Sequence, residues 1–232
     1  MKKIFFALAT VMMFTLTSQA QVRFGAKGGM NISKITAKNW TTKNAYHAGL
    51  YAQINIAPYF SIQPELLYSQ QGSLYESEQS IYYHTITMHS DLTTHNILLP
   101  IMLQYTPIKY LTIEAGPQLG FNFGTKLYYK MNISGILLNE STDQNLILEN
   151  KYINQFEFGL TAGLKINITK NINLYARYIL GMTPVFTEEV SKYNLTQELG
   201  IPIDIAVEDI YDLGEIKDIK NHTIMFGLGI NL

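Results

Sequence analysis

Apolar and polar residues alternate through most of this sequence, and that period of two limits the folds open to it. In 22–32 the even positions are Val, Phe, Ala, Gly, Met and Ile, and the odd positions are Arg, Gly, Lys, Gly and Asn. Successive side chains of a strand point to opposite faces, so this pattern predicts a β-strand with one apolar face. The same period recurs in 46–56, 60–69, 111–123, 152–168, 172–181 and 222–232, whereas 95–105 is apolar at both parities and is a further predicted strand whose orientation only Asn96 and Gln104 indicate. The sequence therefore predicts an all-β fold of about eight strands.

The connections between these strands alternate in length. Three are short (57–59, 106–110 and 169–171), and four are long (33–45, 73–94, 124–151 and 182–220). Outer-membrane barrels have short periplasmic turns and long extracellular loops, and an even number of strands places both termini on the periplasmic side. We therefore predict an eight-stranded antiparallel up-and-down transmembrane β-barrel with four long extracellular loops.

The N-terminus has the layout of a secretory signal peptide. Met1-Lys2-Lys3 precedes an apolar run over 4–16, and the small-residue segment Thr17-Ser18-Gln19-Ala20 follows. The apolar run is shorter than the roughly 20 residues that a membrane-spanning helix needs. We expect cleavage after Ala20, which leaves 21–232 as the barrel domain. The chain has no Cys, so this exported protein must be stable without disulfides.

The same strands could also close into a soluble lipocalin-type barrel with its apolar face inside. Charged residues are only 15% of the chain, against about 25% in soluble domains, and the apolar positions of the strands carry none. The polar positions are mostly Gly, Asn, Gln, Ser and Thr, which suit a crowded lumen better than a solvated surface. These features favour a cell outer-membrane location with lipid around the barrel. The net charge of −1 gives no basic surface for nucleic acid.

The ionisable residues at the polar positions should then share one narrow lumen. They carry both signs of charge: Arg23, Lys27, Glu65, Glu114, Glu157, Lys165 and Arg177. An eight-stranded barrel is just wide enough to be filled by side chains. We therefore predict a lumen charge network and no continuous aqueous pore. Tyrosines near the strand ends fit aromatic girdles at the two membrane interfaces, namely Tyr46, Tyr59, Tyr68, Tyr105, Tyr110 and Tyr178.

Several ordered segments carry a family resemblance. They are Phe24-Gly25-Ala26-Lys27-Gly28-Gly29-Met30-Asn31, Gln63-Pro64-Glu65-Leu66-Leu67-Tyr68-Ser69-Gln70-Gln71-Gly72, Leu99-Pro100-Ile101-Met102-Leu103-Gln104-Tyr105, Ala115-Gly116-Pro117-Gln118-Leu119-Gly120-Phe121, and Ala176-Arg177-Tyr178 with Leu180-Gly181. Together they resemble the PorT-like outer-membrane β-barrel family of Bacteroidetes. The resemblance implies the barrel fold and no shared catalytic motif. The founding member's involvement in assembling a machine that secretes surface proteins makes other envelope or secretion proteins the implied partners.

Two long connections hold residue types that could carry chemistry. His84, His89, Asp91 and His95 precede the fourth predicted strand, in a spacing that matches no known metal motif. A solvated loop or a strand extension is the simpler interpretation. The connection 182–220 is acidic, with Glu188, Glu189, Glu198, Asp204, Glu208, Asp209, Asp212, Glu215 and Asp218 against Lys192, Lys217 and Lys220, but it contains no calcium-loop motif.

No catalytic, cofactor-binding or metal-binding set is predicted, and the chain is expected not to be an enzyme. We expect a small non-porin barrel that acts as a scaffold or binding protein, with assembly of surface-protein secretion as the sharper hypothesis. A barrel-rim enzyme and a soluble lipocalin-type ligand binder remain alternatives.

Overall fold

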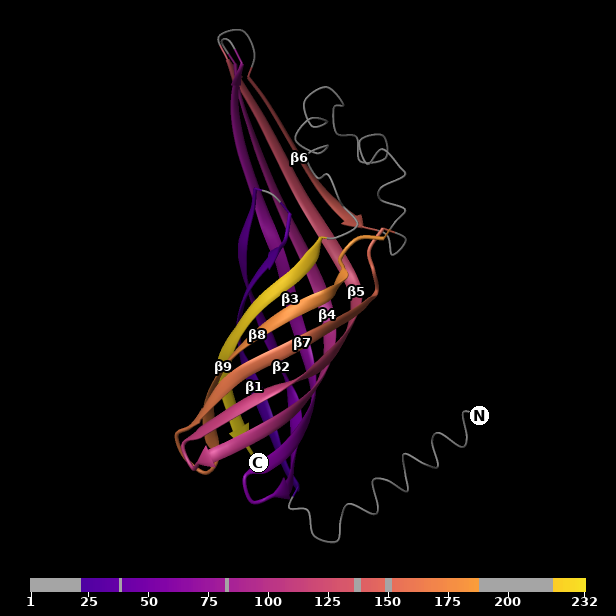
Figure 1. Ribbon diagram of the computed structural model, residues 1–232. Coiled ribbons are helices and arrows are strands. Elements are labelled where there is room, and N and C mark those ends of the chain that lie inside the picture. The colour runs from indigo at the N-terminus through magenta and orange to yellow at the C-terminus, as the bar shows by residue number, and fades with distance from the viewer. Residues whose placement is uncertain (1–21, 38, 82–83, 136–138, 149–151, 188–218) are drawn as a thin grey trace, which may run out of the picture.

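A computed structural model describes residues 22–37, 39–81, 84–135, 139–148, 152–187 and 219–232. Over these residues the chain forms antiparallel strands (Figure 1). Their bounds are β1 (Val22–Ile35), β2 (Trp40–Ala57), β3 (Phe60–Ile81), β4 (His84–Ile108), β5 (Leu111–Gly135), β6 (Asn139–Leu148), β7 (Phe156–Asn167), β8 (Ile172–Pro184) and β9 (Lys220–Asn231). In this part of the chain no helix has the length and apolar character needed to cross a membrane. The predicted signal peptide lies outside the described residues.

Eight of the strands close into a ring. Each strand pairs with its neighbour along the chain, β5 pairs with β7, and β9 pairs back with β1. The short turns and the C-terminus lie at the same end as the start of β1, which we assign to the periplasm (Figure 1). The predicted class, an eight-stranded antiparallel up-and-down barrel, is confirmed.

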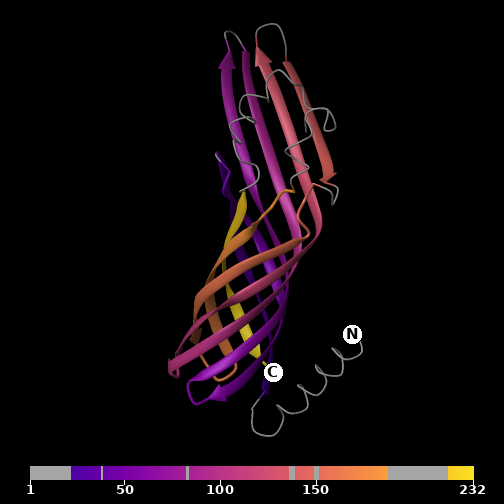
Figure 2. The ribbon, with the colours of Figure 1, turned by 45° about the vertical axis from the view of Figure 1, so that its right-hand side comes forward.

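Two of the predicted long loops are strands instead. Residues 73–81 of β3, 84–95 of β4, 124–135 of β5 and all of β6 form a sheet that continues past the ring, here called the extracellular sheet (Figure 2). β4 and β5 have 25 residues each and β7 has 12, so at about 3.3 Å per residue they are roughly 80 Å and 40 Å long. A tilted strand needs only about 9–11 residues to cross the hydrocarbon region. The extra length of β4 and β5 therefore lies outside the membrane.

The sheet extends because the alternation continues into these segments. Ile86, Tyr129 and Met131 occupy one face of the extracellular sheet and pack together, with Met88 and Ile133 against them. β-branched and aromatic residues at alternate positions favour a strand over a loop. The other predicted loops are also shorter than expected: β1 continues to Ile35, and β2 begins at Trp40. Most of 182–220 lies outside the described residues.

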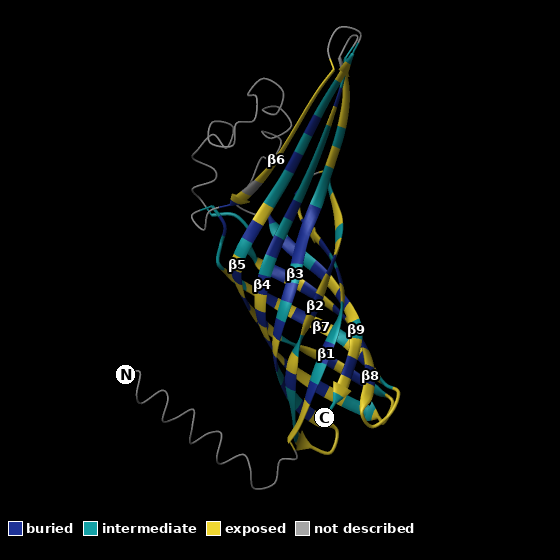
Figure 3. Cartoon of the chain, turned by 180° about the vertical axis from the view of Figure 1, so that it is seen from behind, coloured by how far each residue is buried: buried dark blue, intermediate teal, exposed yellow. Residues whose placement is uncertain are grey.

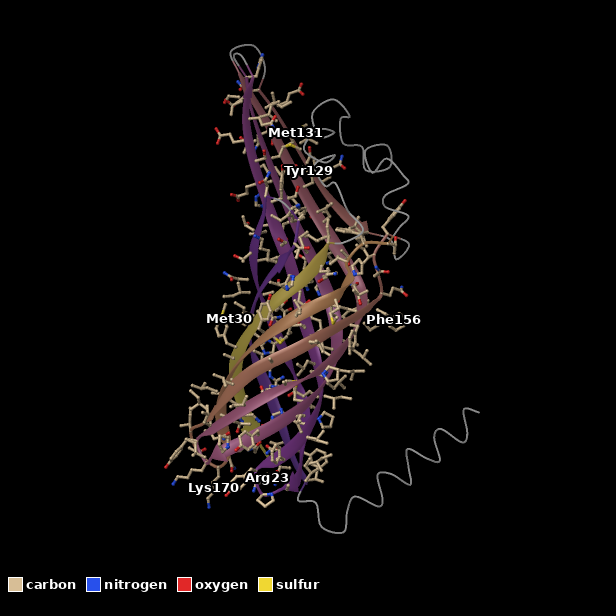
Figure 4. The ribbon with its side chains drawn as sticks, viewed as in Figure 1. Arg23, Met30, Tyr129, Met131, Phe156 and Lys170 are labelled. Atoms are coloured by element: carbon tan, nitrogen blue, oxygen red, sulfur yellow. The ribbon has the colours of Figure 1, made fainter. Side chains whose placement is uncertain are left out.

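The ring has its apolar face outside. Exposed residues, yellow in Figure 3, recur along the strands of the barrel, and the side chains of Met30 and Phe156 point outward in Figure 4. The exposed residues are largely aliphatic and aromatic. They include Phe24, Leu50, Leu66, Leu99, Ile101, Leu119, Leu164, Leu174, Phe226 and Leu228. The polar positions of the same strands are buried inside, with Gln63, Gln104 and Glu114 at most 1% exposed. A soluble barrel would have the reverse arrangement, so the lipocalin-type alternative is wrong for this fold.

Aromatic side chains cluster at both ends of this apolar belt. At the turn end, the rings of Phe60 and Tyr105 stack with centroids 5.0 Å apart. At the other end, Tyr46 and Tyr68 lie 5.8 Å apart, and Phe123 lies 6.2 Å from Tyr68. Amphipathic rings prefer the level of the lipid headgroups. The belt between these two groups is the segment that contacts acyl chains.

Ring closure between β1 and β9 depends on glycine. Gly29 faces Gly227 across the seam that joins the first and last strands. A Cβ at Gly29 would overlap the carbonyl of Phe226 and the Cα of Gly227. Glycine at this pair of positions lets the two backbones approach closely enough to pair.

Candidate functional site

Four charged residues from four strands meet in the lower half of the lumen. Arg177 on β8 donates from Nη1 and Nη2 to the two carboxylate oxygens of Glu65 on β3, at 2.7 Å each, and from Nε to Glu114 on β5. Lys27 on β1 reaches Glu65 at 3.1 Å and lies 4.0 Å from the ring centre of Tyr175. The side chains of these four residues are at most 2% exposed. We call Lys27, Glu65, Glu114 and Arg177 the ionic cluster.

Amide side chains complete the hydrogen bonding of the ionic cluster. Gln63 donates to Glu65 at 2.5 Å, and Gln104 donates both to Glu114 at 2.8 Å and to Gln63 at 2.9 Å. Lys165 on β7 donates to the Gln63 carbonyl oxygen at 3.0 Å. Buried ions are tolerated when their remaining hydrogen-bonding positions are filled, and here neutral amides fill them. The arrangement is suited to rigidity and not to proton transfer.

The seven residues predicted for a lumen charge network fall into three groups. Lys27, Glu65, Glu114 and Arg177 form the ionic cluster, and Lys165 joins it through Gln63. Glu157 faces inward but lies higher, with no ion pair among the described residues. The prediction was wrong for Arg23, which does not lie in the lumen. It is exposed at the turn end, near the first described residue of β1 (Figure 4). Its position has the inward parity, but the barrel wall ends there.

A second polar layer lies next to the ionic cluster, and sequence reasoning did not find it. His47 Nε2 lies 2.5 Å from the Tyr175 hydroxyl, and His47 Nδ1 lies 2.6 Å from Asn31 Oδ1. Asn31 donates in turn to Ser69 at 3.0 Å and to the Gln70 carbonyl at 2.7 Å. The side chains of this layer occupy the polar parity of their strands, namely those of Asn31, His47, Ser69 and Tyr175. Parity was thus a usable signal for their direction, although not for their partners.

An apolar layer closes the lumen next. Leu67, Leu98, Ile179 and Met225 pack together, and each is at most 1% exposed. They stand at positions of the polar parity, so the alternation alone predicted hydrophilic side chains there. Four large apolar side chains across a ring of eight strands leave little room for water. This packing supports a barrel that does not conduct.

Beyond that layer lies a small polar chamber. It is lined by Gly72, Thr94, Asn96, Asn122, Glu157 and Asn221, with Ile35, Leu92, Ile153, Asn154, Phe156, Thr183, Pro184 and Val185 around its upper and outer walls. Its cavity volume is about 30 Å³. A second apolar cluster, which includes Ile35, Leu92, Leu148, Ile153 and Ile219, lies at its upper side. We call this space the upper chamber.

Comparison with known families agrees with this geometry. Residues 17–187 match the outer membrane protein β-barrel domain family. The chain belongs to this family. The match and the outward apolar belt together place this barrel in the cell outer membrane.

Solved structures similar to this outer-membrane barrel are distant. Ail, the attachment invasion locus protein of Yersinia pestis, crystallised with the heparin analogue sucrose octasulfate, is 14% identical; the match covers 91% of this chain and 99% of Ail, with a TM-score of 0.39. Neisserial surface protein A is 10% identical, with 90% and 97% covered and a TM-score of 0.43. CarO2 of Acinetobacter baumannii is 13% identical, with 91% and 100% covered and a TM-score of 0.41. No curated protein matches the chain.

The histidines singled out in the sequence lie on β4 of the barrel and not in a loop. His89 Nδ1 lies 3.2 Å from Glu76, Asp91 pairs with Lys43, and His95 Nδ1 lies 2.7 Å from the Tyr68 hydroxyl. Each of these three residues uses a different partner: Glu76 and Tyr68 lie on the adjacent β3, and Lys43 lies on β2, one strand further. Among the described residues, no three His, Cys, Asp or Glu side chains come close enough to hold a metal ion. The acidic residues from Glu188 to Asp218 lie outside the described residues.

Proposed function

We propose that this outer-membrane barrel is a non-enzymatic binding or scaffold protein whose binding surface is the extracellular sheet. The proposal rests on a structural difference between the membrane-embedded part of the barrel and its extracellular end. The membrane-embedded part is packed with buried polar, ionic and apolar side chains, whereas a four-stranded sheet projects well past the apolar belt (Figures 1 and 2). A filled barrel serves as an anchor, and the projecting sheet is the part that a partner outside the cell can reach.

The extracellular sheet offers a strand edge for contact. Tyr129 and Met131, labelled in Figure 4, pack beside Ile86 and are at most 7% exposed, so these side chains stabilise the sheet and are not a surface for a partner. One edge of the sheet is β6, which pairs with β5 on one side and with no other strand among the described residues. An unpaired strand edge is a feature through which proteins bind partners.

Assembly of a secretion machine for surface proteins is the sharper version of this proposal. It is supported by the resemblance to the PorT-like barrels in the segments around Gln63-Pro64-Glu65 and Leu99-Pro100-Ile101. Deleting the gene should then reduce export of surface proteins, measured as the fraction that reaches the cell surface. Intact export would remove this version and leave the general binding role.

The general role is tested by trimming the extracellular sheet while keeping the barrel. Removing 78–87 and 131–142 and joining each cut with Asn-Gly leaves Ser77 opposite Met88 and Lys130 opposite Asp143, at the starts of two shorter hairpins. We expect the trimmed chain to reach the outer membrane and to keep heat-modifiable migration on SDS gels. It should fail to restore the export, adhesion or envelope-integrity phenotype of the gene deletion, whereas the full chain restores it. A trimmed chain that restores the phenotype fully would refute a binding role for this sheet.

A further inference from the structure

The upper chamber holds a carboxylate that no other group neutralises. The other inward carboxylates of the barrel, Glu65 and Glu114, both contact Arg177. Glu157 has no hydrogen bond or ion pair among the described residues, and it leans over Gly120 beside Leu98. The apolar layer of Leu67, Leu98, Ile179 and Met225 separates it from the ionic cluster. Glu157 is half-buried, and a carboxylate held in a partly enclosed chamber without a partner favours a positive charge beside it.

The chamber also holds a buried acceptor without a partner. Asn221, 8% exposed, lines the chamber, and its Oδ1 is buried without a partner. One inward position further along β9, Thr223 Oγ1 is buried without a partner as well. Asn221 Nδ2 and Asn96 Nδ2 both donate to Gln71 Oε1. The oxygen Oδ1 is therefore the open atom of the Asn221 side-chain amide.

We propose that the upper chamber binds one small monovalent cation, either an alkali-metal ion or a primary ammonium group, through Glu157 and Asn221 Oδ1. One carboxylate among neutral oxygens supplies a single negative charge, whereas calcium sites usually combine several carboxylates. No His or Cys lines the chamber, which disfavours transition metals.

The first test uses the full chain, folded in detergent micelles, with ¹³C-methylammonium as the probe. Exchange between free and bound methylammonium should broaden its ¹³C line with the wild-type chain. Glu157→Gln keeps the shape of the side chain and removes its charge, so it should abolish the broadening. Glu78→Gln is the matched control, since it removes one carboxylate from the extracellular sheet, far from the chamber, and should leave the broadening unchanged.

Competition by potassium or sodium shows whether the site takes an alkali-metal ion or only an ammonium group. If alkali ions occupy the same place, either salt should reverse the methylammonium broadening at constant ionic strength maintained with choline chloride. If only an ammonium group fits, methylammonium should stay bound while choline is exchanged for potassium. Both results support a cation site, and they identify its occupant.

Thermal unfolding provides an independent readout. A cation that binds only the folded chain at about 10 mM affinity should lower the unfolding constant about tenfold at 100 mM. Glu157→Gln should lose this dependence, and Glu78→Gln should keep it. The proposal is overturned if wild type and Glu157→Gln respond equally to every cation, or if Glu157→Gln is the more stable chain in all salts with no cation dependence in either.

Discussion

Replacing Arg177 by Met is the most informative perturbation of the barrel interior. Met fills similar space without charge, so the change removes three charge-assisted hydrogen bonds, two to Glu65 and one to Glu114. Each such bond contributes about 1.5–3 kcal/mol, but Lys27 and Gln63 still serve Glu65 in the variant. Glu114 is left with Gln104 alone. Removing one partner of a buried ion pair typically costs about 3–5 kcal/mol, and we expect Arg177→Met to lose that much unfolding free energy.

A double-mutant cycle with Glu114→Gln separates charge from packing. Alone, Glu114→Gln should cost about 1–3 kcal/mol, because Arg177 keeps its paired contact with Glu65. Added to Arg177→Met, it removes the stranded carboxylate and should restore at least about 1.4 kcal/mol, a tenfold change in the unfolding constant. Arg177→Lys is the conservative control and should lie between wild type and Arg177→Met, since an ammonium cannot contact both carboxylates through a planar fork.

The measurement is urea unfolding of the chain in lipid vesicles, followed by heat-modifiable migration and tryptophan fluorescence from Trp40, the only Trp in the chain. A loss below about 1 kcal/mol for Arg177→Met would show that the ionic cluster adds little to stability. Strict additivity of the two substitutions would show that Arg177 and Glu114 are not coupled. Either result would refute the reasoning.

Three further predictions follow from the barrel wall and its interior. Gly29→Ala should prevent ring closure and abolish the heat-modifiable band, because the added Cβ would overlap the backbone of Phe226, whereas Gly124→Ala, with open space around it, should change stability by less than about 0.5 kcal/mol. Ile101→Arg, in the apolar belt, should cost about 2–4 kcal/mol in vesicles, while Ser134→Arg in the extracellular sheet should cost almost nothing; equal costs would refute the membrane position of the belt. Planar-bilayer recordings should show no large steady conductance, and a stable open channel would refute the packed lumen.

The direction of most side chains could be predicted from the sequence, but their height in the lumen could not. Glu65, Glu114 and Arg177 lie on β3, β5 and β8, which are not adjacent in the ring, and they meet across the lumen. Parity indicates that each points inward. Whether they reach the same level depends on strand tilt and stagger, which arise from the pairing of all eight strands. The same limit explains Arg23, which has the inward parity but stands past the end of the wall.

β6 shows a different limit of sequence patterns. Its residues from Asn139 to Asn145 are polar at both parities, so nothing in them predicts a strand. They nevertheless pair with β5 from Tyr128 to Ser134. The edge of an already extended β5 supplies unsatisfied backbone groups, and pairing with them outweighs the weak strand preference of β6. A strand that forms through its neighbour cannot be found by its own period.

The polar interior of the lumen follows from two opposing requirements on the sequence, one from contact with lipid and one from export. A barrel strand must be apolar toward lipid, yet a chain apolar at every position would be read as a membrane helix during export. Alternation avoids this by forcing polar residues into the interior, where each one needs a partner. In the ionic cluster the partners come from within the chain, and Gln63 and Gln104 complete them. In the upper chamber Glu157 has no partner among the described residues, and Asn221 Oδ1 is buried without one. A small ligand would therefore contribute most in the upper chamber, where polar groups of the interior are left without a partner.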